Sequence, residues 1–248
     1  MIFALREFKR RGIEAETIGL IDGDSTKLTA TDAVLLPIPA TRDSVNINCP
    51  ITKRIIPLDM FKALPKSVKV FGGGKTNINN YTDLLSLDEF ALKNCVLTAE
   101  GAIAYAIENT EFSLWKSRVL IIGYGRLGKI LTDRLKCFNP ALTVSARSKK
   151  DFSMLDSLGI NHIKTNEISN ASGQFDIVFN TVDIRFDSGV AQSLSEAYFF
   201  DLSSRGGFVS ETAENYGIKY IALPSIPAKT APDTAGKIIA ETVIELLY

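Results

Sequence analysis

The feature that most constrains the fold is a short apolar run leading into three glycines at the spacing G-x-G-x-x-G, within residues 119–128. β-favouring residues precede the first glycine, and apolar residues at helical spacing follow the third. In such a unit the first glycine permits a tight turn, the second lets the backbone approach a pyrophosphate, and the third lets the helix pack closely on the sheet. The pattern therefore predicts a dinucleotide site at the start of a helix. The residues expected there are Gly123, Tyr124, Gly125, Arg126, Leu127 and Gly128.

Short apolar runs alternate with helical patterns along the whole chain, which is typical of parallel α/β architecture. Before the glycine motif, strands are expected near residues 15–20, 33–38, 68–72 and 95–98. After it, strands are expected near residues 142–146, 176–182, 198–202 and 219–222. The predicted fold class is two-domain α/β, with a C-terminal doubly wound parallel Rossmann sheet of about five strands and a smaller N-terminal α/β domain.

The same alternation suggests domain boundaries. We expect an N-terminal α/β domain for substrate and partner at residues 1–97, a connector helix at 98–116 and the nucleotide-binding domain at 117–230. Residues 231–248 have an apolar helical period after a proline-rich stretch. Two interpretations of this last helix stay open: it packs back toward the first domain, or it closes the second sheet.

Composition excludes several classes of protein. The chain has 248 residues, and its 28 basic and 28 acidic side chains cancel, so no bulk charge favours nucleic acid or an anionic membrane. Three cysteines without C-x-x-C spacing argue against a disulfide framework or a zinc site. The single histidine, His162, is expected in a structural loop. Without a signal peptide or a long apolar run, the protein is predicted to be cytoplasmic, and its self-association stays open.

The residues after the second strand of the nucleotide domain indicate which dinucleotide binds. NAD-binding sheets carry a carboxylate there that bonds the ribose 2′-hydroxyl. Here the strand runs into Arg147, Ser148 and Lys149 instead. A guanidinium fork, a hydroxyl and an ammonium suit a 2′-phosphate, which predicts NADP rather than NAD. The alternative is an ordinary solvated helix start.

Two further strand ends carry candidate binding groups. Asn180 and Thr181 close one predicted strand and are expected to line the cofactor, because strand ends face the ligand crevice in open α/β sheets. Arg205 follows the next strand beside two glycines and is expected to clamp a substrate carboxylate. The competing interpretation of Arg205 is a surface ion pair with Glu211 or Glu214.

Two more candidates are less constrained by their surroundings. Arg42 follows a predicted strand of the first domain and is a candidate for a second carboxylate, or else an exposed loop cation. Glu100 is expected at the start of the connector helix, where it either caps the helix or acts as a general base.

An ordered set of motifs resembles the A subunit of dipicolinate synthase over residues 15–247. The segments that carry the resemblance are residues 98–101, 123–128, 146–148, 180–181, 201–207 and 231–236. The resemblance implies two domains, a nicotinamide cofactor and, as partner, a flavoprotein-like B subunit. It also implies the last step to dipicolinic acid in spore-forming bacteria, from a lysine-pathway dihydro- or tetrahydropyridine dicarboxylate. Members of that family begin with an additional strand that is expected to be missing here.

The resemblance also bears on the candidate residues. A dicarboxylate substrate needs two cations, which fits Arg205 and Arg42, and Glu100 is a candidate to take a proton. Two other functions stay open: a non-catalytic NADP-binding protein with a regulatory or scaffold role, and a different two-domain NAD(P)-dependent dehydrogenase. The leading interpretation is an NADP-dependent oxidoreductase subunit.

Overall fold

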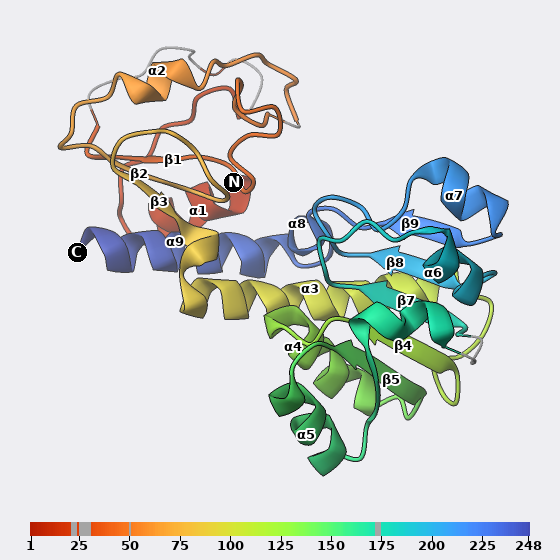
Figure 1. Cartoon of the computed structure of the whole chain (residues 1–248). Coiled ribbons are helices and arrows are strands. Elements are labelled where there is room, and N and C mark those ends of the chain that lie inside the picture. The colour runs from red at the N-terminus through yellow and green to blue at the C-terminus, as the bar shows by residue number, and fades with distance from the viewer. Residues whose placement is uncertain (21–23, 25–30, 50, 172–174) are drawn as a thin grey trace. The chain divides into compact units, whose positions relative to one another are not determined.

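The computed structural model of the chain describes residues 1–20, 24, 31–49, 51–171 and 175–248 (Figure 1). It contains two compact units. The first combines Met1–Asn94 with Pro232–Tyr248, and the second is the continuous segment Cys95–Ala231. Each unit contains a parallel sheet with helices, so the predicted α/β fold class with a larger C-terminal Rossmann sheet is confirmed.

The second unit is built on a six-stranded parallel sheet in the order β6-β5-β4-β7-β8-β9. Its strands are β4 (Arg118–Ile122), β5 (Ala141–Ala146), β6 (Asn161–Lys164), β7 (Ile177–Asn180), β8 (Tyr198–Asp201) and β9 (Lys219–Ala222). The chain order reverses between β4 and β7, the strands that carry the glycine motif and Asn180. In open α/β sheets the carboxyl ends of the strands at such a switch point form the ligand crevice.

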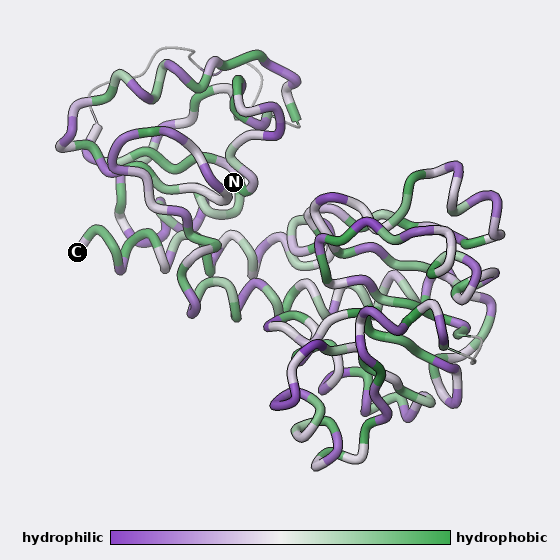
Figure 2. The backbone as a smooth tube through the Cα atoms, viewed as in Figure 1, coloured by the Kyte–Doolittle hydropathy of each residue, from purple (hydrophilic) through white to green (hydrophobic). Residues whose placement is uncertain are grey.

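Helices cover both faces of this sheet, because its strands are apolar on both sides. Val119 and Ile121 of β4 face one core, while Leu120 and Ile122 face the other. The runs of hydrophobic residues along β4 and β7 are visible in Figure 2. On the first face lie part of α3 (Asp88–Asn109), α4 (Arg126–Lys136), α5 (Lys149–Ser157) and α8 (Ile226–Thr230). On the second lie η2 (Thr165–Asn170), α6 (Ser188–Ser193) and α7 (Ser210–Asn215).

The strand predicted at residues 95–98 is wrong, since these residues lie inside the long helix α3. Alanines at helical spacing around them, including Ala99, Ala102 and Ala106, are fully buried and decide the local structure. By length and composition, α3 is the one helix in the described part of the chain that could span a membrane. Its buried side chains instead contribute to the cores of both units.

The first unit has three parallel strands in the described residues, β1 (Ala33–Leu35), β2 (Lys69–Gly72) and β3 (Tyr81–Asp83), in the order β1-β2-β3. Residues 15–20 form no strand, which corrects another expectation, and β3 has no counterpart among the predicted strands. Short elements α2 (Asp59–Lys62) and η1 (Leu84–Ser86) complete this part. Val70 faces one core and Phe71 the other, so alternation along β2 divides the unit into two layers.

The layer behind Phe71 is formed by α1 (Ile2–Arg10) and α9 (Pro232–Leu247), which lie side by side (Figure 1). Gly236 permits this contact, because a Cβ there would lie 2.4 Å from the Phe3 Cβ. Arg11 adds an ion pair to Glu241 of α9, with 2.6 Å between Nη2 and Oε1. The first unit therefore depends on both ends of the described chain.

A carboxylate in α1 should make the stability of this unit sensitive to acid. The Arg10 and Arg11 guanidiniums bonded to Glu7 lower the pKa of its carboxyl to about 2. A lowered native pKa stabilises the fold above the ordinary value near 4.5, and that stabilisation is lost as the pH falls toward 2. Glu7→Gln should therefore lower the urea midpoint at pH 7, and the deficit should shrink at pH 3. Glu14→Gln, at an exposed position, is the control; a deficit that stays constant with pH would contradict the assignment.

Candidate dinucleotide and carboxylate site

The glycine turn after β4 has the geometry that its spacing predicts. Gly123 has a φ of +101°, in the region that side chains disfavour, and its N–H donates to the Ser145 carbonyl at 3.2 Å. A Cβ on Gly128 would lie 2.1 Å from the Gly123 carbonyl oxygen. The first and third glycines therefore allow the turn and bring α4 against the strand end.

Gly125 differs from its two neighbours because the space beside it is open. It has an ordinary φ of −77°, it is the N-cap of α4, and a Cβ built there would meet no atom within 4 Å. Because glycine has no side chain, it gives the first amides of α4 no capping bond, and the first turn of the helix contains no acidic residue. The Gly125 turn therefore fits a pyrophosphate, which would bind to these amides and to the positive end of the helix dipole.

Two predicted residues of the glycine loop contribute to the core with their side chains. The Tyr124 ring is 9% exposed and packs in the core beneath the sheet edge, and burial raises the pKa of its hydroxyl. Leu127 packs partly buried against the same core. What the loop presents outward is its backbone, as expected of a motif that binds phosphate through N–H groups.

The end of β5 carries the residues predicted to select the dinucleotide. Arg147 and Lys149 are exposed, and no carboxylate stands at the end of the strand. Ser148 is the N-cap of α5: its hydroxyl accepts from the Asp151 N–H at 3.1 Å and donates to the Asp151 carboxylate at 2.7 Å. Asp151 in turn pairs with Lys129 of α4 at 3.6 Å. The serine therefore starts the helix, and the two cations beside it are left at the surface.

Asn180 and Thr181 fix the edge of the sheet from within. Asn180 is fully buried, and its Nδ2 donates to the Asp201 carboxylate at 3.0 Å and to the Val182 carbonyl at 3.1 Å. The Thr181 hydroxyl donates to the Ile122 carbonyl at 2.8 Å. Their contact with a cofactor stays a prediction, while their side chains bind the ends of β4, β7 and β8 together.

Asp201 is a buried carboxylate to which the sequence pattern assigned no role. It is 2% exposed, and its two oxygens accept from Asn180, from the Ser203 and Gly207 N–H groups and from the Tyr220 hydroxyl. Burial, followed by the Asp201 carboxylate, raises the pKa of the Tyr220 hydroxyl. The available signal was a carboxylate closing an apolar strand directly before a glycine-containing loop. Asp201 closes the base of the loop that carries Arg205.

Arg205 lies exposed on this loop after β8. Among the residues that the structure describes, its guanidinium makes no ion pair with Glu211 or Glu214, the alternative partners. The carboxyl ends of β4, β7 and β8 lie at one edge because the strands are parallel neighbours. The glycine turn and Arg205 therefore belong to the same edge of the sheet.

Glu100 does not start a helix, and this prediction is corrected. It lies more than two turns inside α3, beside Arg134 of α4, with 3.9 Å between Oε1 and Nε. Arg134 is roughly 12 Å along α4 from the turn that would hold phosphate, at 1.5 Å per residue. A capping role is excluded, because the helix begins at Asp88. Its role as a general base stays a prediction that this position does not support.

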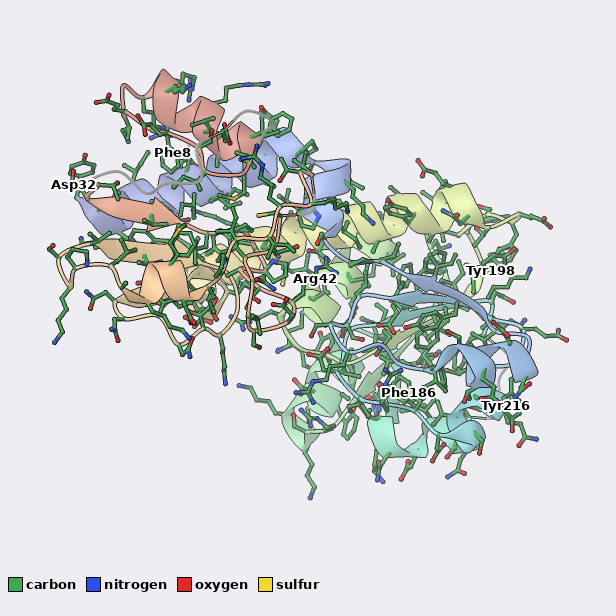
Figure 3. All side chains as sticks on the ribbon, turned by 90° about the horizontal axis from the view of Figure 1, so that it is seen from above. Phe8, Asp32, Arg42, Phe186, Tyr198 and Tyr216 are labelled. Carbon is green, nitrogen blue, oxygen red and sulfur yellow. The ribbon has the colours of Figure 1, made fainter. Side chains whose placement is uncertain are left out.

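Arg42 belongs to the first unit, on an exposed turn labelled in Figure 3. The neighbouring Asp43 organises that turn by accepting from the Val45 and Asn46 N–H groups at 2.8 and 2.7 Å. These bonds keep the pKa of the Asp43 carboxyl well below its usual range. Binding of a second carboxylate by Arg42 stays a prediction.

His162 lies in β6 rather than in a loop, which is a further correction. Its ring stacks on Phe152 with centroids 4.8 Å apart, and Nε2 lies 3.0 Å from the Asp156 carboxylate. A strand of four residues with polar ends has too little apolar alternation to be recognised from sequence. Within the described residues, no group of three or more His, Cys, Asp and Glu side chains could hold a metal ion.

The six-stranded sheet with a glycine turn at its switch point defines a Rossmann-type protein with the fold of nicotinamide-dependent dehydrogenases. The chain is 27% identical to the A subunit of dipicolinate synthase of Bacillus subtilis over 238 residues, covering 90% of this chain and 80% of the relative. It is a homologue of that dipicolinate synthase protein, and the resemblance predicted from the ordered motifs is confirmed. No family model matches the chain.

Solved structures show the same fold. The A subunit of dipicolinate synthase from Bacillus halodurans superposes with a TM-score of 0.86 at 24% identity, over 99% of this chain and 93% of that one. The corresponding dipicolinate synthase protein from Bacillus subtilis gives 0.83 at 24% identity, over 99% and 91%. A transhydrogenase from Sinorhizobium meliloti gives 0.64 at 10% identity, over 98% and 80%.

Proposed function

We propose that this chain is the NADP-dependent oxidoreductase subunit of a dipicolinate synthase. It would form dipicolinate from a lysine-pathway dihydro- or tetrahydrodipicolinate, in the cytoplasm and together with a flavoprotein-like B subunit. The observation that carries the proposal is the open turn at Gly125 on the sheet edge that also bears Arg205. The homology supports the substrate class, and the relative's name, which makes it one lettered component of a larger enzyme, supports a second subunit.

Each part of this edge has a chemical task in the proposal. The first amides of α4 bind the pyrophosphate, and Arg147 with Lys149 binds the 2′-phosphate through charge-assisted bonds. Arg205 binds and orients one substrate carboxylate. Aromatising a dihydropyridine removes one hydride and one proton, and a bound nicotinamide supplies the hydride acceptor. The proton acceptor is not assigned by these contacts.

The proposal is tested with the assembled two-subunit enzyme, by following nicotinamide absorbance and dipicolinate formation together. One NADPH should form for each dipicolinate made from the dihydro compound, and omission of this chain should abolish both signals. Dipicolinate formation without any change in the nicotinamide would contradict the redox role. That outcome would favour the alternative of a non-catalytic NADP-binding subunit.

The preference for NADP should depend on Arg147. Arg147→Ala should lower the ratio of NADPH to NADH affinity about ten- to thirtyfold, because an exposed charge-assisted bond contributes at the low end of about 1.5–3 kcal/mol. Fluorescence titration with both nucleotides measures the ratio. Lys136→Ala removes an exposed cation from the opposite end of α4 and should leave the ratio unchanged. Equal loss of NADH and NADPH affinity on Arg147→Ala would refute phosphate selection.

A further inference from the structure

The loop between β8 and α7 donates five consecutive backbone amides to side-chain oxygens. Asp201 accepts from the amides at its two ends, residues 203 and 207, and the Ser203 hydroxyl accepts from the Gly206 N–H at 3.1 Å. The two amides at the tip, those of residues 204 and 205, are bonded from outside the loop. The tip is the part that carries the Arg205 side chain.

The outside acceptor is Asp183, from the loop that follows β7. Its Oδ1 accepts from the Ser204 N–H at 2.7 Å, the Ser204 hydroxyl at 2.9 Å and the Arg205 N–H at 3.3 Å. Asp183 lies two residues after Thr181, whose hydroxyl is bonded to the end of β4. A continuous set of bonds thus connects the glycine-motif strand to the backbone of Arg205.

We propose that Asp183 is a positioning residue for Arg205, holding the tip of its loop at a fixed place relative to the dinucleotide turn. The inference rests on the proposed function, because it takes Arg205 as the carboxylate anchor. It adds a residue that makes no contact with substrate through its own side chain and acts through the Ser204 and Arg205 amides. A guanidinium binds a carboxylate through two parallel bonds only when its backbone is oriented, which is why the tip has to be held.

The surroundings separate this role from a general structural one. Asp183 is exposed and belongs to no core, so its removal leaves no cavity. The two loops stay joined without it, because the Phe186 N–H donates to the Gly207 carbonyl at 2.8 Å. The Phe186 ring, labelled in Figure 3, also packs 5.4 Å from that of Phe208. Loss of Asp183 should therefore release the tip while the base of the loop and the fold remain.

Binding of dipicolinate, measured by calorimetry in the assembled enzyme with NADP present, is the first readout. Asp183→Ala should weaken it about five- to twentyfold, from about 1–2 kcal/mol of lost loop hydrogen bonding. Asp183→Asn keeps the Oδ1 acceptor and removes a negative charge beside the anion, so it should bind as well as the unchanged chain. Asp187→Ala, which removes an equally exposed carboxylate four residues away, is the control.

Hydrogen exchange without substrate is the second readout. Asp183→Ala should speed exchange of the amides of residues 204 and 205, and Asp187→Ala should not. Unchanged exchange at these amides would overturn the proposal, as would unchanged dipicolinate affinity in Asp183→Ala when Arg205→Ala weakens it. If Arg205→Ala itself leaves dipicolinate affinity unchanged, the proposed function has failed at its anchor, and faster exchange in Asp183→Ala identifies that failure as separate from the loop.

Discussion

Gly125→Val should weaken NADPH binding by at least a hundredfold while the chain stays folded. A side chain at this position would enter the open space beside the turn, where the protein places no atom within 4 Å, so a clash arises only with a bound pyrophosphate. The backbone tolerates valine, since its φ is −77°. The cost to the fold is limited to the N-cap preference, about 1 kcal/mol. Fluorescence titration gives the affinity, and a thermal melt gives the stability.

A graded pair of variants makes this result specific to the dinucleotide. Gly125→Ala adds one methyl group and should give an intermediate loss of affinity. Gly128→Ala places its Cβ against the Gly123 carbonyl and should lower stability as well as affinity. Full NADPH affinity in Gly125→Val would mean that no phosphate approaches this turn.

Arg205→Ala should weaken dipicolinate binding roughly thirty- to hundredfold, with NADPH affinity unchanged. Removing one partner of a charge-assisted, bidentate contact costs about 2–3 kcal/mol, which corresponds to this factor. Arg205→Lys keeps the charge without the fork and should recover only part of the affinity. Calorimetry with dipicolinate, with and without NADP, measures both effects.

The competing interpretation of Arg205 as a surface ion-pair partner predicts a different pattern. If Arg205 served to pair with Glu211, then Glu211→Ala would reproduce the effects of Arg205→Ala. We expect Glu211→Ala to leave dipicolinate affinity unchanged, since no such pair forms among the described residues. Parallel loss in both variants would refute the role of Arg205 as an anchor.

The sheet of the second unit was predictable because its signals are local. Each of β4, β5, β7, β8 and β9 is a short apolar run, and a glycine turn follows β4 directly. Residues 95–98 show where local patterns fail: a β-favouring run became helix because alanines on either side are buried together. Tertiary burial of this kind overrides propensity and cannot be seen in a four-residue window.

The backbone of the candidate site was likewise more predictable than the tasks of its side chains. The position of Gly125 follows from motif spacing, and the prediction that Ser148 binds cofactor directly overlooked its capping bond to Asp151. Asp183 and Asp201 act across loops from different strands, and their partners are set by the strand order. A single sequence contains no signal for such pairings until the order of the strands is known.

The pairing of α1 with α9 has a consequence for how the chain is made. Synthesis proceeds from the N-terminus, and domains generally fold as units once their residues are available. The second unit is continuous in sequence, so it can fold while later residues are still being added. Ala4 and Phe8 must wait for Ala240 and Val243 before they are buried, so the first unit to be translated is the last to be completed.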